Sequence, residues 1–136
     1  MSQPPAFVDL ASVRDDRGDL TVLDSWDALP FTPVRLFLVT GVPAGVRRGG
    51  HAWREGHELL VCASGSCTID TECPTGCETF VLDRADRGLY LPPMVWMEYE
   101  LSSPSASLMV LASTHYDPGD IIADHVTFLT YSSQAP

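Results

Sequence analysis

The chain has 136 residues, a length typical of one domain with a single hydrophobic core. Hydrophobic residues make up 45% and charged residues 19%, which excludes a disordered chain and a coiled coil. The charged residues are 18 acidic side chains and eight arginines, with no lysine, so the net charge of −10 repels nucleic acids and anionic membranes. We therefore expect one domain over residues 1–136, with no nucleic-acid or membrane partner.

No stretch approaches the roughly 20 consecutive apolar residues of a membrane span, and the first residues lack the pattern of a signal peptide. We therefore expect a cytoplasmic protein. Its four cysteines are expected to be free thiols, since their spacing differs from the paired C-x2-C motifs of a zinc ribbon. A disulfide between Cys73 and Cys77 would require oxidation after purification.

Eleven prolines and ten glycines divide the chain into short apolar runs, which is typical of a sandwich or barrel of short strands. Residues 7–10 and 20–23 flank a polar turn and are predicted to form a hairpin. Residues 25–29 fit a short helical turn, and residues 34–39 are predicted to form a strand.

A second tight hairpin is predicted at Ser64-Gly65, between strands at residues 58–63 and 66–70. Apolar residues share one face over residues 121–131, which predicts a short C-terminal helix. Further strands are predicted at residues 78–82, 88–91, 95–101 and 107–112.

The segment from Gly45 to Gly65 follows the spacing G-x5-H-x-H-x4-E-x6-G, which is the first motif of cupins. His51 and Glu58 fit this motif, but Trp53 stands where its second histidine belongs, and Met97 stands where a second motif would add another. Two histidines two apart on a strand face the same side and can chelate one ion. Because two remaining ligands are fewer than the three or four of a divalent site, we expect no metal and no cofactor.

The chain resembles the WxcM-like small cupins that act as dTDP-4-keto-6-deoxyglucose 3,4-ketoisomerases. This resemblance implies a cupin double-stranded β-helix, a jelly-roll barrel that forms a dimer by exchanging N-terminal strands. It also implies a metal-free reaction that moves a keto group between adjacent sugar carbons through an enediol, with a histidine pair as proton carriers. The matching segments are Arg14–Leu20, Arg35–Phe37, Arg48–Ala52, Leu60–Cys67, Gly88–Tyr90, Val95–Trp96, Val110–Ser113 and Tyr116–Asp117.

Carried over residue by residue, His51 keeps the position of the first histidine of that pair, and Trp53 replaces the second. The candidate catalytic residues are therefore His51 and Glu58, while His57 is expected to face the opposite side of its strand. Arg35 and Arg48 are candidates to bind a diphosphate by bidentate contacts. The full set of candidate substrate-binding residues is Arg35, Phe37, Arg48, Trp53, Tyr90, Trp96, Met97 and Met109.

Three functions remain open from the sequence. The first is an isomerase of specialised metabolism acting on a nucleotide-linked keto-sugar. The second is a cofactor-free cyclase or pericyclase that folds an apolar polyketide or macrolide against the aromatic side chains, since such a reaction needs shape more than a proton relay. The third is a non-catalytic sugar-binding cupin. The resemblance implies a homodimer.

Overall fold

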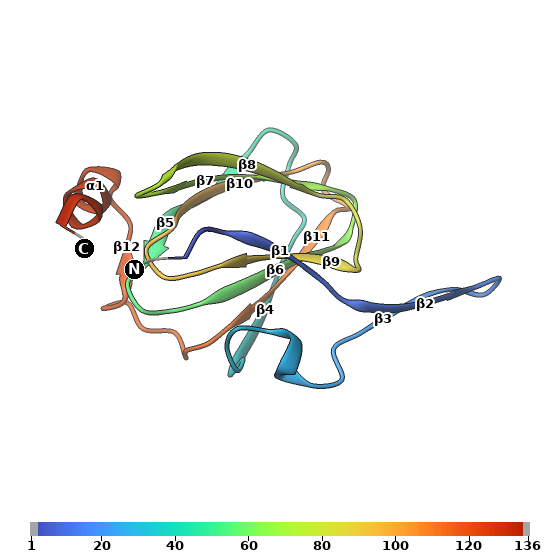
Figure 1. The fold of residues 1–136 in the computed structure, drawn as a ribbon. Coiled ribbons are helices and arrows are strands. Elements are labelled where there is room, and N and C mark those ends of the chain that lie inside the picture. Colours follow the sequence, from blue (N-terminus) through green and yellow to red (C-terminus); the bar gives the residue numbers. More distant parts are fainter. Residues whose placement is uncertain (1–2, 135–136) are drawn as a thin grey trace.

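Two five-stranded antiparallel sheets face each other in the part of the chain that the structure, a computed structural model, describes: residues 3–134 (Figure 1). Sheet one contains, in spatial order, β1 (Ala6–Asp9), β9 (Arg87–Leu91), β6 (Glu58–Ser64), β11 (Ser107–Ala112) and β4 (Arg35–Thr40). Sheet two contains β12 (Ile121–Ile122), β5 (Arg47–Trp53), β10 (Trp96–Leu101), β7 (Cys67–Cys73) and β8 (Gly76–Leu82). The all-β, cupin-like jelly-roll fold expected from the sequence is confirmed.

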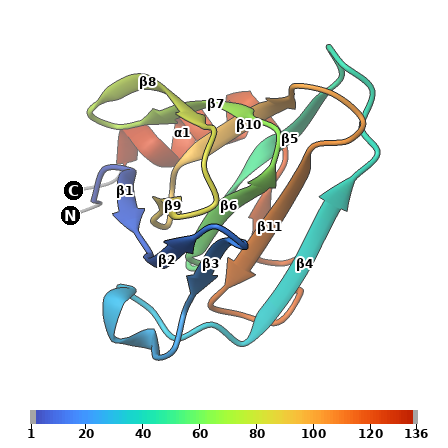
Figure 2. The same cartoon turned by 90° about the vertical axis from the view of Figure 1, so that its right-hand side faces the viewer.

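The remaining elements lie at the two ends of this body. A hairpin of β2 (Ala11–Asp15) and β3 (Gly18–Val22) projects from one end, and α1 (His125–Gln134) lies at the other (Figures 1 and 2). The 3-10 helix η1 (Trp26–Ala28) confirms the helical turn predicted near residue 25. Within residues 3–134, no helix is long and apolar enough to cross a membrane.

The main core lies between the sheets because each strand turns every second side chain inward. On β11, Leu108 and Val110 belong to this core, while Met109 and Leu111 pack on the other face of the sheet. Opposite them, β10 contributes Met97, Tyr99 and Leu101. The core also buries Cys62 and Cys67, and the four cysteines are free thiols.

The outer faces of both sheets are partly covered. Leu10, Leu29 and Phe31, which flank or follow the β2–β3 hairpin, pack over the outer side of β6, β9 and β11. On sheet two, Phe128 of α1 packs against Trp96 and Ile122.

The predicted N-terminal hairpin exists, but its arms differ from the prediction. The turn lies between Asp15 and Gly18, and the arms are β2 and β3. Residues 6–9 form the separate strand β1, which pairs with β9 about 80 residues away in the chain. The alternation of apolar residues was correct as a strand signal, but it could not show that the partner strand is distant.

The hairpin predicted at Ser64-Gly65 is wrong. β6 belongs to sheet one and β7 to sheet two, so the connection crosses from one sheet to the other. Gly65 has φ +72°, as a tight turn requires, but its close neighbour is the β10–β11 connection: a Cβ on Gly65 would lie 2.7 Å from the Ala106 Cβ. Turn residues thus indicated a tight reversal without showing which strands pair.

The predicted C-terminal helix starts later than expected. Ile121 and Ile122 form β12 and pair with Trp53 and Ala52 of β5. The helix begins at His125, because the Asp124 carboxylate accepts hydrogen bonds from the Thr127 backbone N–H and hydroxyl, at 2.9 and 2.7 Å.

The close approach at Gly65 predicts a stability difference between two alanine variants. Gly65→Ala and Gly41→Ala both place a side chain at a left-handed φ, +72° and +70°, which costs about 1–2 kcal/mol. Only in Gly65→Ala does the added methyl group also collide with a neighbouring side chain, that of Ala106. The free energy of unfolding of this variant should therefore fall by about 1–3 kcal/mol more than that of Gly41→Ala. Urea denaturation of both variants measures this difference, and equal losses of unfolding free energy would contradict the close approach of Gly65 to Ala106.

Candidate active site

β5 presents His51 and Trp53 to the interior of the sandwich. The two ring centroids lie 5.4 Å apart, and Ala52 between them faces α1. His51 pairs across the strands with Met97, which lies in the main core, so His51 and Trp53 share the inner face. The spacing of two residues therefore places an imidazole and an indole side by side in the interior.

A bulge in β5 adjusts this presentation. Gly49 and Gly50 have φ values of +83° and +75°, and the register with β10 shifts at this point. A Cβ on Gly49 would lie 2.7 Å from the Met97 Sδ and 2.9 Å from the Met97 carbonyl oxygen. Only glycine therefore allows Met97 to pack this closely. On the N-terminal side of the bulge, Arg48 pairs with Tyr99 of β10. Burial raises the pKa of the Tyr99 hydroxyl, and the Arg48 guanidinium lowers it in part.

Glu58 begins β6 and is a buried carboxyl, 3% exposed. Burial raises the pKa of Glu58 to about 7, although the Trp53 indole and the Arg35 cation both favour the carboxylate. The indole nitrogen lies near the carboxyl without a hydrogen bond of good geometry in the described structure. A carboxyl with its pKa raised in this way keeps its proton to higher pH than an ordinary glutamate, which suits a group that both donates and accepts protons.

The pKa of His51 is shifted in the opposite direction from that of Glu58. Burial lowers the pKa of His51, so the imidazole is neutral at pH 7 and can accept a proton. Its Nδ1 atom is buried and has no hydrogen-bond partner among residues 3–134. The interior therefore combines a neutral imidazole with a buried carboxyl whose pKa is raised.

Arg35 brings a positive charge to the same region. Its guanidinium carbon lies 5.4 Å from the ring centroid of Phe37, 5.6 Å from that of Trp53 and 5.9 Å from that of Tyr116. Within the described part of the chain, Arg35 makes no ion pair with an acidic side chain, and its buried Nε atom has no hydrogen-bond partner. This cation is chemically suited to an anionic ligand.

Three of the candidate substrate-binding residues do not face the interior, so the expectation that they lie inside the barrel is wrong. Trp96 faces outward, where its ring packs 5.7 Å from that of Phe128. Tyr90 and Met109 pack on the outer face of sheet one. The physical reason is the alternation of side chains: Trp96 and Met97 are neighbours on one strand, so only one of them can face inward.

His57 faces the opposite side of the chain from Glu58, as expected. Its Nδ1 atom lies 2.7 Å from the Tyr90 hydroxyl, and its ring stacks against Phe31 at 5.7 Å. Burial lowers the pKa of His57. His57 therefore supports the packing of the N-terminal segment and is separated from the interior by sheet one.

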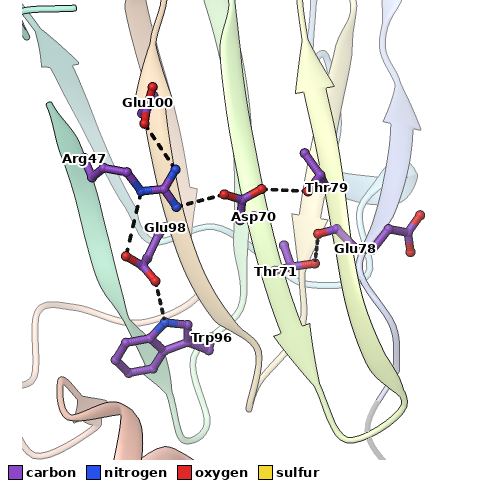
Figure 3. A network of polar contacts seen from close by, with 8 residues as sticks. All are labelled: Arg47, Asp70, Thr71, Glu78, Thr79, Trp96, Glu98 and Glu100. Carbon is purple, nitrogen blue, oxygen red and sulfur yellow. Dashed lines mark hydrogen bonds and ion pairs between the residues drawn. The ribbon is translucent and has the colours of Figure 1, made fainter. Parts of the chain in front are cut away.

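The outer face of sheet two carries a separate polar network. Arg47 contacts Asp70 at 2.9 Å, Glu100 at 3.3 Å and Glu98 at 3.9 Å, and Glu98 also accepts a hydrogen bond from Trp96 (Figure 3). A hollow of about 650 Å³ lies beside this network. Because Arg47 is fully paired with acids and the hollow lies outside the sheet, these groups cannot act together with His51. No three His, Cys, Asp or Glu side chains within residues 3–134 are grouped to hold a metal ion.

Two residues near the site were not predicted from the sequence. Tyr116 lies beside Arg35, and the buried carboxylate of Asp120 contacts the loop between Trp53 and Glu58. Both follow β11, far from the motif in sequence. A matching segment at Tyr116–Asp117 was the one sequence signal for this region, and nothing in the local pattern distinguished Asp120.

Comparison with known proteins agrees with this fold. The family model described as "FdtA: WxcM-like, C-terminal" matches residues 4–133. The chain is 31% identical over 124 residues to a TDP-4-oxo-6-deoxy-alpha-D-glucose-3,4-oxoisomerase of Aneurinibacillus thermoaerophilus, covering 91% of this chain and 89% of the relative.

Solved structures give the same result. A sugar 3,4-ketoisomerase from Thermoanaerobacterium thermosaccharolyticum in complex with TDP superposes with a TM-score of 0.91 at 28% identity, covering 96% of this chain and 95% of that one. A TDP-quinovose 3,4-ketoisomerase from Campylobacter jejuni gives 0.85 at 32% identity, covering 93% and 97%. The chain belongs to this WxcM-like family of sugar 3,4-ketoisomerases and is an isomerase with a cupin-like fold.

Proposed function

We propose that this protein converts a TDP-linked 4-keto-6-deoxy sugar into its 3-keto isomer without a metal ion. The observation that carries the proposal is a buried carboxyl with a pKa of about 7, Glu58, in an interior that also contains the neutral imidazole of His51. The relatives support the substrate class, because they include a TDP-4-oxo-6-deoxy-glucose oxoisomerase and a ketoisomerase crystallised with TDP.

In the proposed reaction His51 moves the proton on carbon and Glu58 moves the protons on oxygen. His51 removes the proton from C3, the electrons of that C–H bond form the C3=C4 double bond, and the protonated Glu58 gives its proton to O4. The resulting enediol loses the O3 proton to the Glu58 carboxylate, while the His51 imidazolium returns its proton to C4. No atoms or electrons are gained or lost, so no oxidant or cofactor is needed.

Positive charge and ring surfaces would hold the substrate. We propose that Arg35 and Arg48 bind the diphosphate, since neither makes an ion pair within the described part of the chain. Their local charge can attract an anion despite the net charge of −10, because screening limits distant charges to a range of about 10 Å. Phe37, Trp53 and Met97 would then face the sugar.

A second candidate function is a cofactor-free cyclisation of an apolar polyketide. The observation that favours it is the apolar character of the inner face, to which Phe37, Trp53 and Met97 all contribute. A reaction of this kind would depend on the shape of these side chains and not on proton transfer by His51.

We also propose that two copies form a cytoplasmic homodimer. β4 is at the edge of sheet one, and its outward side chains Leu36 and Leu38 are 55% and 61% exposed. The projecting hairpin exposes Val13 and Leu20 by 61% and 63%. Apolar side chains at an open sheet edge favour association, and exchange of N-terminal strands is what the family resemblance implies.

The acid–base assignment predicts a bell-shaped dependence of kcat/KM on pH, because this ratio reports the acid and base of the free enzyme. Activity should fall above about pH 7, where Glu58 loses the proton it must donate, and below the lowered pKa of His51, where the imidazole is protonated. Glu58→Gln should lower kcat about 100-fold and remove the upper limb. Turnover of TDP-4-keto-6-deoxyglucose, followed by NMR from pH 5 to 9, tests this, and an unchanged upper limb in Glu58→Gln would contradict the assignment.

Substitutions in the interior separate isomerisation from cyclisation. We expect His51→Asn to lower kcat for the keto-sugar at least about 100-fold, whereas Met97→Ala, which removes only apolar contacts, should change kcat less than about tenfold. Assays of both variants at saturating substrate compare these losses. The reverse order would contradict a proton relay through His51 and favour a reaction controlled by shape.

The proposed dimer predicts a mass in solution of twice that of the chain. Replacing both Leu36 and Leu38 by Glu places charges on the exposed apolar edge and should shift the protein to monomers. Val81→Glu is the control, because Val81 is 50% exposed on β8 of the other sheet. Light scattering after size-exclusion chromatography measures the mass, and a monomeric wild-type protein would contradict the proposal.

A further inference from the structure

One segment after β11 binds the whole connection between β5 and β6. This connection, residues 54–57, has four successive backbone N–H groups, and each donates a hydrogen bond to Asp120 or Ser113. The Arg54 N–H bonds to the Asp120 carbonyl oxygen at 2.8 Å, the Glu55 and Gly56 N–H groups bond to the two Asp120 carboxylate oxygens at 2.9 and 3.0 Å, and the His57 N–H bonds to the Ser113 hydroxyl at 2.8 Å.

Asp120 supplies three of these four contacts from a buried position. Its side chain is 9% exposed, and a Cβ on Gly56 would lie 3.1 Å from the Asp120 Oδ2 and 3.4 Å from the Trp53 Cβ. The connection is therefore held tightly between the carboxylate and the end of β5. A charged acceptor that receives two backbone N–H groups makes stronger hydrogen bonds than a neutral one.

The connection joins two residues of the site. Trp53 ends β5, Glu58 begins β6, and these strands belong to different sheets. No strand pairing fixes Trp53 relative to Glu58, because β5 and β6 are not hydrogen-bonded neighbours. Residues 54–57 link the two directly, so their conformation limits where Trp53 and Glu58 can lie relative to each other.

We propose that Asp120 is a positioning residue for the isomerase: by fixing residues 54–57, it sets the placement of Trp53 and Glu58 relative to each other. Asp120 acts through the backbone and does not touch the substrate. The part of this inference that concerns turnover rests on the function proposed above. The part that concerns the environment of Glu58 does not.

The inference also has an electrostatic consequence. The charged or titratable groups that act on or respond to the charge of Glu58 are Arg35 on β4 and Tyr99 on β10. Asp120 adds no comparable charge effect, so its removal changes Glu58 by moving the connection. A looser connection admits water to the carboxyl, which reduces the cost of its charged form.

Asp120→Asn is the test variant, because an amide keeps the shape of the side chain but offers one acceptor to the two loop N–H groups. We expect kcat for TDP-4-keto-6-deoxyglucose to fall about tenfold with KM changed less than about twofold, since placement and not binding is lost. The pKa of Glu58, measured by NMR with 13C-labelled glutamate, should fall from about 7 toward its ordinary value of 4.5. Hydrogen exchange at the Glu55 and Gly56 amides should become at least about tenfold faster than in the wild type.

Asp117→Asn is the matched control. Asp117 lies in the same segment and its carboxylate accepts a hydrogen bond from the Gly119 N–H, but within the described part of the chain its side chain makes no hydrogen bond to residues 54–57. This control should leave kcat, the Glu58 pKa and the loop amides unchanged. If Asp120→Asn lowers the melting temperature but leaves the Glu58 pKa and amide exchange at wild-type values, Asp120 is only structural and the inference is overturned. If the wild type fails to convert the sugar, the proposed function fails, while the Glu58 titration and the amide exchange still decide the inference about Asp120.

Discussion

The burial of the Glu58 carboxyl is the constraint on which the site depends. Of the acidic side chains in residues 3–134, Glu58 and Asp120 are the buried ones, and both are next to the β5–β6 connection. Asp120 faces two backbone N–H donors, which satisfy a carboxylate. Glu58 begins a strand and its side chain faces the apolar interior. Keeping the proton is therefore the main means by which this carboxyl avoids an uncompensated buried charge. The fold thus creates one carboxyl suited to structure and one suited to proton transfer.

The alternation of side chains explains how far the sequence could predict this site. The motif spacing correctly put His51 and Trp53 on one face, and the family resemblance pointed to Arg35 and Arg48. Alternation also explains the errors, because Trp96 and Met97 were both assigned to the interior although adjacent residues of a strand face opposite sides. A stricter use of the period of two would have excluded Trp96.

Long-range pairing explains what the sequence could not predict. In a jelly roll, successive strands often lie in different sheets, so the turn residues Ser64 and Gly65 look the same whether they join paired strands or cross between sheets. For the same reason Asp120 gave no local signal: its hydrogen-bond partners lie 64 and 65 residues earlier in the chain. Most strands were predictable from local patterns, although β2, β5 and β12 were not among those predicted, whereas strand order and loop anchoring depend on contacts between distant segments.

Trp53 stands beside Glu58 where the cupin motif has a histidine, and the two side chains differ in what they can do there. An imidazole at residue 53 would place a second group that can carry a proton and a charge beside Glu58, whereas an indole carries neither and excludes water with a large apolar surface. Burial raises the pKa of the Glu58 carboxyl to about 7, whereas the Trp53 indole N–H favours the carboxylate and so opposes this rise. In the proposed mechanism, burial and not the indole itself makes Glu58 the second proton carrier. The pair of proton carriers is kept, although one member is a carboxyl on the opposite sheet.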